Sequence, residues 1–222
     1  MKKICITNQK GGSGKSTLAA LITLTLANDN KKVLAIDCDP QGALTALFGA
    51  GLGPGLFDIL IRTAADPVEA RGIEILRADH RLDKIVYTLP PFEMQRVIKD
   101  YDYDFIVMDC PPTVQGISRA AALAADIILV PADISRTTFG ATLYTLEALE
   151  EIEKEGRVLF IGKEPKPENQ GYQAELFREF KKAVKKHYAG TIPRAIGAQK
   201  AAAGLAKVPA VISGIIQGAL WK

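Results

Sequence analysis

The sequence predicts one α/β domain, built on a mostly parallel, twisted sheet with helices on both faces. Short apolar runs alternate with stretches of helical spacing, which is the order of strand and crossover helix in such folds. Two runs, at 104–109 and 126–131, are almost unbroken in apolar character, as expected of strands buried on both faces. The length of 222 residues suits a single domain over residues 1–222.

The individual elements follow from these alternating segments. Strands are expected at 2–6, 32–37, 73–78, 104–109, 126–131 and 158–162, and a last strand ends within 191–194. Helices are expected at 16–27, 44–48, 56–62, 91–99, 138–155 and 174–188. Glycine punctuates the chain at 49–55, and the polar, proline-containing stretch 163–171 predicts an exposed loop.

Composition excludes several classes of protein. No apolar run reaches the roughly 18 residues of a membrane span, and the N-terminus lacks the apolar stretch of roughly 7–15 residues found in secretory signals. We therefore expect a cytoplasmic protein. The three cysteines include no CxxC pair, which argues against a zinc site. Two interpretations of them stay open: small buried thiols, or an iron–sulfur cluster shared between two chains.

Positive charge is concentrated in the last third of the chain. Residues 1–150 carry 15 Lys and Arg against 18 Asp and Glu, whereas residues 151–222 carry 13 against 7. A basic region on a nearly neutral body suggests a surface that faces a polyanion. An ordinary solvated helix face explains the same charges equally well.

The stretch NQKGGSGKST, residues 8–17, predicts a phosphate-binding loop between the first strand and the first helix. The standard pattern is G-x-x-x-x-G-K-[ST], and Gly14, Lys15 and Ser16 match its second half. Gln9 stands where the first glycine would fall, and Gly11 and Gly12 follow Lys10 instead. The loop is therefore a P-loop with an altered front.

The physical roles within this loop follow from residue type. Glycines at 11, 12 and 14, with Ser13 between them, allow backbone N–H groups to turn toward phosphate oxygens. The helix that starts near Ser16 adds its positive end. Lys15 is expected to bridge the outer phosphates, the Ser16 hydroxyl to ligate Mg²⁺, and Thr17 to lie near the α-phosphate. These residues predict a site for ATP or ADP with Mg²⁺.

Three aspartates end apolar strands. Asp37 and Asp39 follow the second strand, and Asp109 ends the strand at 104–109 in the manner of a Walker-B segment. Parallel strands bring their carboxyl ends to one edge, where ligands bind. A helix cap or turn would explain any one of these residues, because turns with proline follow. Together with the phosphate loop they favour carboxylates near Mg²⁺ or near the attacking water.

These motifs resemble the ParA/MinD superfamily of deviant Walker A ATPases. The residues that carry the resemblance are KGGSGKST (10–17), VLAIDCDPQG (33–42), YDFIVMDCPPT (103–113) and AADIILVPADIS (124–135). TIPRAI (191–196) is similar to the late segment that lies beside adenine in that family. The match extends from residue 1 to about residue 196.

The resemblance implies a role for the second lysine of the loop. Lys10 matches the signature lysine, which crosses to the nucleotide of a second subunit when two chains sandwich two ATP molecules, as an arginine finger does. It thus implies a homodimer in the ATP-bound state. By the same resemblance Asp39 would position the attacking water, Asp37 would act near the Mg²⁺ shell and Asp109 would be the Walker-B carboxylate. Pro193 and Arg194 would line the adenine.

The resemblance is strongest to the DNA-partition branch. DPQG and DCPPT look like ParA, and no helix-turn-helix extension precedes the loop, as in small ParA proteins. It implies nonspecific DNA binding on the nucleoid and stimulation by a ParB-like adaptor. Basic residues expected to contact phosphates in DNA are Lys181, Lys182, Lys185, Lys186, Arg194, Lys200 and Lys207.

Two rival functions stay open at this point. A MinD-like membrane-cycling ATPase would use the apolar tail 211–222 as an amphipathic helix, although its polar face has almost no positive charge. We expect that tail to dock on the sheet instead, so that membrane binding is not favoured. A redox protein similar to nitrogenase iron protein would also begin with KGG-x-GKS, but its cluster cysteines have no evident counterparts here.

Overall fold

A single sheet of eight strands organises the part of the chain that the structure describes. The computed structural model describes residues 1–166, 168–193, 200–202 and 207–221. The strand order is β3-β4-β2-β5-β1-β6-β7-β8, and all neighbours are parallel except β3 and β4. The strands are β1 (Lys2–Ile6), β2 (Val33–Asp37), β3 (Val68–Ala70), β4 (Ile73–Leu76), β5 (Phe105–Asp109), β6 (Ile127–Ala132), β7 (Gly156–Ile161) and β8 (Tyr188–Ile192).

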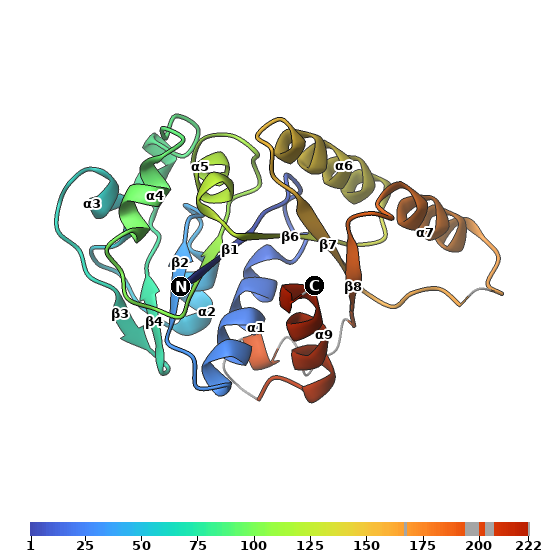
Figure 1. The fold of residues 1–222 in the computed structure, drawn as a ribbon, viewed down its shortest axis with the longest axis horizontal. Helices are drawn as coiled ribbons and strands as arrows, with labels where there is room; N and C mark the ends of the chain where they lie inside the picture. The colour runs from blue at the N-terminus through green and yellow to red at the C-terminus, as the bar shows by residue number, and fades with distance from the viewer. Residues whose placement is uncertain (167, 194–199, 203–206, 222) are drawn as a thin grey trace.

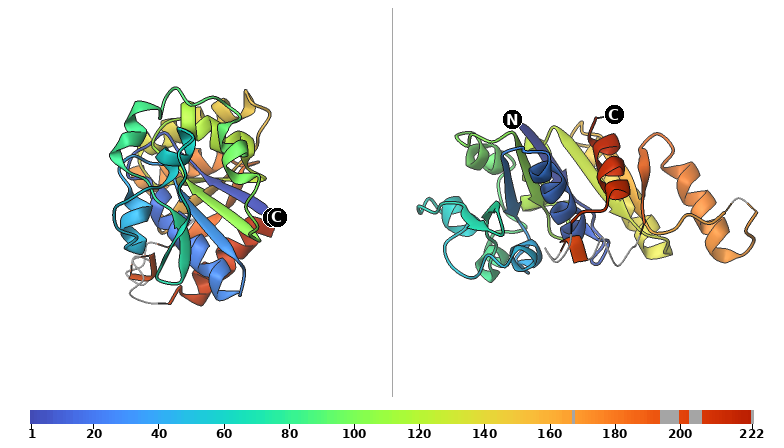
Figure 2. Two further views of the ribbon diagram at one scale, coloured as in Figure 1. Left: turned by 90° about the vertical axis from the view of Figure 1, so that its left-hand side faces the viewer. Right: turned by 90° about the horizontal axis from the view of Figure 1, so that it is seen from below.

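Helices cover both faces of this sheet (Figures 1 and 2). One group comprises α1 (Lys15–Asn28), α2 (Ala43–Phe48) and α9 (Ala210–Trp221). The other comprises α3 (Leu56–Leu60), α4 (Glu93–Ile98), α5 (Gly116–Ala124), α6 (Arg136–Glu150) and α7 (Tyr172–Ala183), and a 3₁₀ turn, η1, spans His80–Lys84. The predicted α/β architecture is confirmed.

Alternation along the strands divides the core into two halves. In β1, Ile4 and Ile6 pack in the cluster that includes α1 and α9, whereas Cys5 packs in the cluster that includes α4, α5 and α6. All three side chains are fully buried. Strands of this kind, covered on both sides, need apolar residues at every position, which is why the runs in the sequence were continuous.

The C-terminal helix is part of the core. Ile212, Ile216, Ala219 and Leu220 are buried in the cluster that includes α1. At its end, the Trp221 ring lies edge-on to Phe105, with centroids 5.9 Å apart, and Lys2 Nζ lies 4.0 Å above that ring. The docked arrangement expected for this tail is confirmed. No helix among the described residues combines the length and apolar character needed to cross a bilayer.

One helix prediction was wrong at its C-terminal end. The apolar spacing suggested a helix over 174–188, but α7 ends at Ala183, and Lys185 and Lys186 lie in the turn before β8. Tyr188 pairs instead with Val158 as the first residue of β8. Val184 and Tyr188 continue the apolar spacing of a helix by coincidence. Pairing with β7 places Tyr188 in a strand instead. Similarly, α6 spans Arg136–Glu150 where 138–155 was expected.

Candidate nucleotide site

The phosphate loop lies between β1 and α1, and its backbone has the conformation that its glycines allow. Gly12 and Gly14 have φ angles of 74° and 93°. These lie in the left-handed region, which residues with a Cβ atom rarely adopt. A Cβ at Gly11 or Gly12 would meet no atom within 4 Å, so at Gly12 it is the backbone conformation that demands glycine. Gly14 is also the N-cap of α1, so the loop leads directly to the positive end of that helix.

Lys15 is the first residue of α1 and is almost completely buried. Its Nζ donates a hydrogen bond to the Lys10 carbonyl oxygen at 3.0 Å. Burial lowers the pKa of Lys15, and the negative charges of Asp109 and Asp39 act in the opposite direction. The tertiary structure therefore brings Lys15, Asp39 and Asp109 together, although they lie far apart in the sequence.

Asp37 is buried and accepts hydrogen bonds on both carboxylate oxygens. Oδ2 accepts from the backbone N–H and the hydroxyl of Thr45, both at 2.8 Å, and Oδ1 accepts from the Asp39 N–H at 3.2 Å. Burial raises the pKa of Asp37 to about 6, and the Thr45 donors limit that rise. Asp37 thus also holds the first turn of α2. It therefore has the structural role in a turn that the sequence analysis left open, and it lies at the candidate nucleotide site as well.

Asp109 is completely buried and differs from Asp37 in its contacts. Among the described residues, neither of its carboxylate oxygens has a hydrogen-bond partner of good geometry, although the Ser16 hydroxyl is near enough to lower its pKa in part. Burial, followed by repulsion from Asp37, raises the pKa of Asp109 well above its usual range. A buried carboxylate without partners is costly, and a cation beside it would remove the cost.

These residues fit a magnesium nucleotide. Ser13 Oγ, in the loop, is buried without a hydrogen-bond partner from any described residue, as are the Asp109 oxygens. No three His, Cys, Asp or Glu side chains in the described ranges are placed to hold a metal ion by themselves. Mg²⁺ commonly keeps several waters and takes phosphate oxygens with only one or two carboxylates, so this donor set is suitable. Ser16, Asp109 and Asp37 are the residues that would hold it.

The remaining expected site residues occupy the same edge of the sheet or lie outside the described chain. Asp39 follows β2, and its Oδ1 accepts a hydrogen bond from the Gln41 N–H at 3.0 Å. Ser16 and Thr17 lie in the first turn of α1 and are partly exposed. Pro193 directly follows β8, while Arg194 lies outside the described residues.

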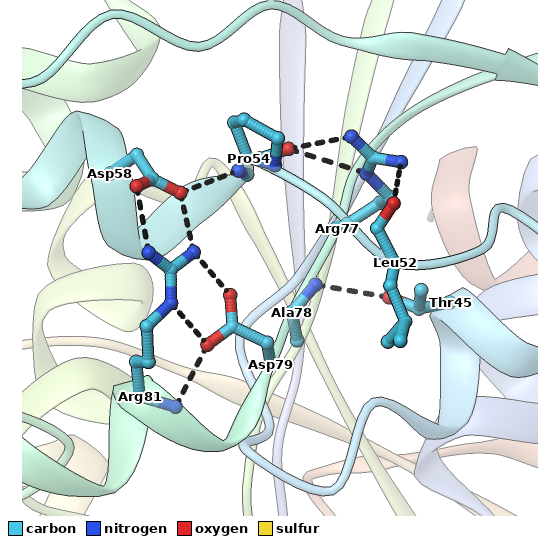
Figure 3. A network of polar contacts seen from close by, with 9 residues as sticks. Thr45, Leu52, Pro54, Asp58, Arg77, Ala78, Asp79 and Arg81 are labelled. Atoms are coloured by element: carbon cyan, nitrogen blue, oxygen red, sulfur yellow. Dashed lines mark hydrogen bonds and ion pairs between the residues drawn. The ribbon is translucent and has the colours of Figure 1, made fainter.

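Thr45 is a residue of the site that the sequence analysis did not identify. Its hydroxyl donates to Asp37 and accepts from the Ala78 N–H at 3.0 Å. Beside it, Arg77 donates to the carbonyl oxygens of Leu52 and Pro54 (Figure 3). Gly55 is required there because a Cβ would lie 2.3 Å from the Arg77 carbonyl oxygen. No spacing pattern in the sequence links these segments.

Arg81 completes this network at its outer side. Its guanidinium pairs with Asp58 at 2.6 Å and with Asp79 at 2.7 Å (Figure 3). The hydrogen bonds from Arg81 hold the pKa of both carboxyl groups below the usual range. The segments that follow β2 and β4 are therefore fastened to each other, with Asp37 at one end of the chain of contacts.

The three cysteines lie together in the core. Cys5, Cys38 and Cys110 are free thiols with no exposed surface, and the Sγ atoms of Cys5 and Cys110 are 3.5 Å apart. A cluster shared between two chains would need thiols at a surface. Cys38 and Cys110 would have to leave the core to provide them, which favours the interpretation as small buried thiols.

The described members of the expected DNA-binding set are exposed but not equally available. Lys181 Nζ pairs with Glu164 at 2.9 Å, and Lys186 Nζ pairs with Glu150 at 2.7 Å. Glu164 also accepts hydrogen bonds from Tyr188 and Thr191, so its side chain is committed to this cluster. The other described members of the expected DNA-binding set, Lys182, Lys185, Lys200 and Lys207, are exposed.

The site combines the phosphate loop, the N-terminus of α1 and carboxylates at the ends of β2 and β5. Together with the fold, these features define a P-loop nucleotide-binding protein of the α/β class. A family model described as an AAA domain matches residues 1–158. The chain belongs to this family and is of the ParA/MinD type.

Curated relatives agree with this assignment. The chain is 30% identical over 158 residues to the chromosome-partitioning ATPase Soj of Thermus thermophilus, a match that covers 68% of this chain and 63% of that protein. It is 31% identical over 166 residues to the sporulation initiation inhibitor protein Soj of Bacillus subtilis, with the same coverage. The match thus spans less than two thirds of either relative.

A solved structure shares the whole fold. A plasmid partition protein of Borrelia burgdorferi, solved with AMPPNP bound, superposes with a TM-score of 0.80 at 20% identity. The superposition covers 99% of this chain and 96% of that one. At this level of identity the likeness establishes the architecture, and the chemistry has to be argued from the site.

Proposed function

We propose that the chain is a Mg²⁺-dependent ATPase that segregates DNA, in which ATP joins two subunits and hydrolysis to ADP parts them. The observation that carries this proposal is the buried Asp109 carboxylate, which has no hydrogen-bond partner of good geometry and lies near Lys15 and Ser16. A polar site that is complete only with a cation and an anion fits Mg²⁺ and a nucleotide. The partition role is supported by the names of the curated relatives.

The chain's own residues divide the work at this site. Lys15 exchanges its contact with the Lys10 carbonyl for the outer phosphates, and the N–H groups of the loop hold the remaining oxygens. Asp39, in the turn after β2, is partly exposed and orients the attacking water. When bound, Mg²⁺ neutralises charge on the phosphates. Pro193, directly after β8, lines the adenine.

Lys10 acts in the partner's site. Its carbonyl receives Lys15, while its own side chain is partly exposed at the front of the loop. A positive group supplied across an interface stabilises charge that develops on the transferred phosphoryl group. The chain is therefore a dimer when ATP is bound and a single chain when ADP is bound.

The dimer binds DNA without sequence preference and is stimulated by a ParB-like adaptor. Exposed lysines on and after α7 provide contacts to phosphates, and the release of counterions supplies the affinity. This activity places the protein on the nucleoid. The docking of α9 in the core speaks against the membrane-cycling alternative, because the apolar face formed by Ile212, Ile216, Ala219 and Leu220 is already buried.

The test combines sedimentation with DNA binding. The Asp39→Ala variant, loaded with Mg²⁺ and ATP, should sediment as a dimer, and with ADP as a single chain. A DNA mobility-shift series at several salt concentrations should show binding only with ATP. If the ATP-loaded variant sediments only as single chains, the proposal is overturned. If DNA binding is equal with ATP, with ADP and without nucleotide, DNA binding does not depend on the nucleotide and that part of the proposal fails.

A further inference from the structure

Asn8, at the start of the phosphate loop, has no exposed surface and uses both ends of its amide group. Its Oδ1 accepts a hydrogen bond from the Lys10 N–H at 2.9 Å. Its Nδ2 donates to the Pro131 carbonyl at 2.9 Å and to Thr142 Oγ1 at 3.1 Å. Buried amides are costly unless satisfied, and these three bonds fix the group in one orientation. Asn8 thereby joins the backbone of Lys10 to β6 and α6.

A second bond to α6 holds the adjacent residue. The Gln9 N–H donates to Thr145 Oγ1 at 3.2 Å, and Thr145 donates to the Ala141 carbonyl at 2.7 Å within the same helix. Thr142 and Thr145 are separated by three positions, so they lie on one face of α6. The front of the loop, residues 8–10, is therefore attached to a rigid helix through side chains.

The two lysines of the loop are held by different means. Lys15 belongs to α1, so helical hydrogen bonds fix its backbone. Lys10 lies outside any helix or strand, and its N–H is held by Asn8. A lysine side chain is long and loses much rotamer entropy when its ammonium group is immobilised. If its backbone were also loose, contact with a second subunit would cost still more.

We propose that Asn8 and Thr142 are positioning residues that fix the point from which Lys10 reaches into the partner's nucleotide site. The proposal rests on the proposed function, because it assumes that Lys10 acts in the partner subunit. Through Asn8, helix α6 would fix the backbone of Lys10, independently of the way that α1 fixes Lys15.

Thr142→Val is the variant that separates these roles. It keeps the branched shape of the side chain and removes the oxygen that accepts from Asn8, whereas Thr142→Ser keeps that oxygen. We expect Thr142→Val to retain affinity for a fluorescent ATP analogue within about twofold. We expect the association constant of its ATP-dependent dimer and its kcat each to fall about tenfold. A factor of this size corresponds to the usual contribution of one buried hydrogen bond. Thr142→Ser should restore both.

The control is Thr25→Val on α1. Thr25 Oγ1 is buried and has no hydrogen-bond partner within the described ranges, so the same substitution there tests the effect of removing a buried threonine hydroxyl alone. Amide hydrogen exchange at Lys10 should accelerate in Thr142→Val and stay unchanged in Thr25→Val. If Thr142→Val does not fold, Thr142→Ala serves instead, because it removes the same acceptor oxygen without placing a charge in the buried site.

Each result decides between the two proposals. Loss of dimerisation with retained nucleotide affinity supports the positioning role. A parallel loss of nucleotide affinity and dimerisation would assign these residues to loop folding alone and overturn it, as would no effect at all. If Lys10→Ala dimerises with wild-type affinity, the proposed trans role of Lys10 fails, whatever Thr142→Val does.

Discussion

Asp37 and Asp109 are register partners at the ends of the adjacent parallel strands β2 and β5, and both are fully buried. They differ in their hydrogen bonds within the part of the chain that the structure describes: Asp37 accepts three, whereas the Asp109 oxygens have no partner of good geometry. Each carboxylate raises the free energy of its neighbour's charged form, and burial adds to this effect. The pair therefore stores a cost in the nucleotide-free protein that a bound cation would relieve.

Asp109→Asn should stabilise the nucleotide-free protein while abolishing its ATP turnover. The substitution removes a buried charge that lacks good partners, and the usual cost of an unsatisfied buried polar group suggests a gain in the free energy of unfolding of about 1–2 kcal/mol. Tm should rise by roughly 3–6 °C. Thermal unfolding followed by circular dichroism measures the change. Asp37→Asn is the matched control and should gain less, since its carboxylate oxygens satisfy three donors. A lower Tm for Asp109→Asn would contradict the inference that the buried Asp109 carboxylate destabilises the nucleotide-free protein.

Stability of the nucleotide-free protein should depend on pH through Asp37. Its pKa rises from 3.8 when free to about 6 in the folded chain. A carboxyl group with a raised folded pKa contributes stability in full below its unfolded pKa and loses it as the pH rises through the folded value. The free energy of unfolding should therefore fall by about 3 kcal/mol between roughly pH 4 and pH 7 from this group.

Urea unfolding at a series of pH values measures this slope. The free energy of unfolding of the Asp37→Asn variant should fall by less over this range, because the contribution of Asp37 is lost. Those of Asp109, whose pKa is raised, and of Asp58 and Asp79, whose pKa values are lowered, remain. Equal slopes in the two proteins would exclude Asp37 as the titrating group. Addition of Mg²⁺ and a non-hydrolysable ATP analogue should flatten the slope of the unmodified protein as well.

Lys15→Ala and Lys10→Ala should fail at different steps. Lys15 is buried near Asp109 and Asp39, so its removal takes away the charge that holds phosphates. We expect no measurable binding of a fluorescent ATP analogue by Lys15→Ala. Lys10→Ala should bind the analogue but fail to dimerise or to hydrolyse ATP, as ultracentrifugation and phosphate release would report. Full turnover by Lys10→Ala would refute its role in the partner's site.

Asp39→Ala should bind ATP and remain dimeric without turnover. Asp39 lies in a turn and is partly exposed, so its removal leaves the buried part of the site in place. A single-turnover measurement of bound ATP over time distinguishes slow chemistry from slow product release. Rapid hydrolysis in this variant would exclude Asp39 from the reaction.

The exposed lysines should not contribute equally to DNA binding. Lys181 and Lys186 already pair with Glu164 and Glu150, which offsets their charge. Each phosphate contact adds about 0.9 to the slope of log affinity against log salt. The double variant Lys182→Ala, Lys185→Ala should therefore lower that slope by about 2. Lys181→Ala with Lys186→Ala should lower it by less, and equal reductions would show that these ion pairs do not matter.

Much of the architecture could be predicted because continuous apolar runs leave few alternatives. The segments 104–109 and 126–131 became β5 and β6 within one residue, since strands covered on both faces must be apolar throughout. The weaker elements were not predicted: β3 is three residues long, and α5 is a nine-residue helix rich in alanine. At the end of α7, helical spacing gave the wrong result because Tyr188 pairs with Val158.

The sequence by itself determined the phosphate loop and the family, since a local motif carries its own backbone geometry through Gly12, Gly14 and the start of α1. Only the tertiary structure decided which distant groups complete the site. Thr45 meets Asp37 because α2 folds back beside β2, and Asn8 meets Thr142 across 134 positions of chain. Hydrogen bonds act over about 3 Å of space whatever the separation along the chain, so no spacing in the sequence reveals them.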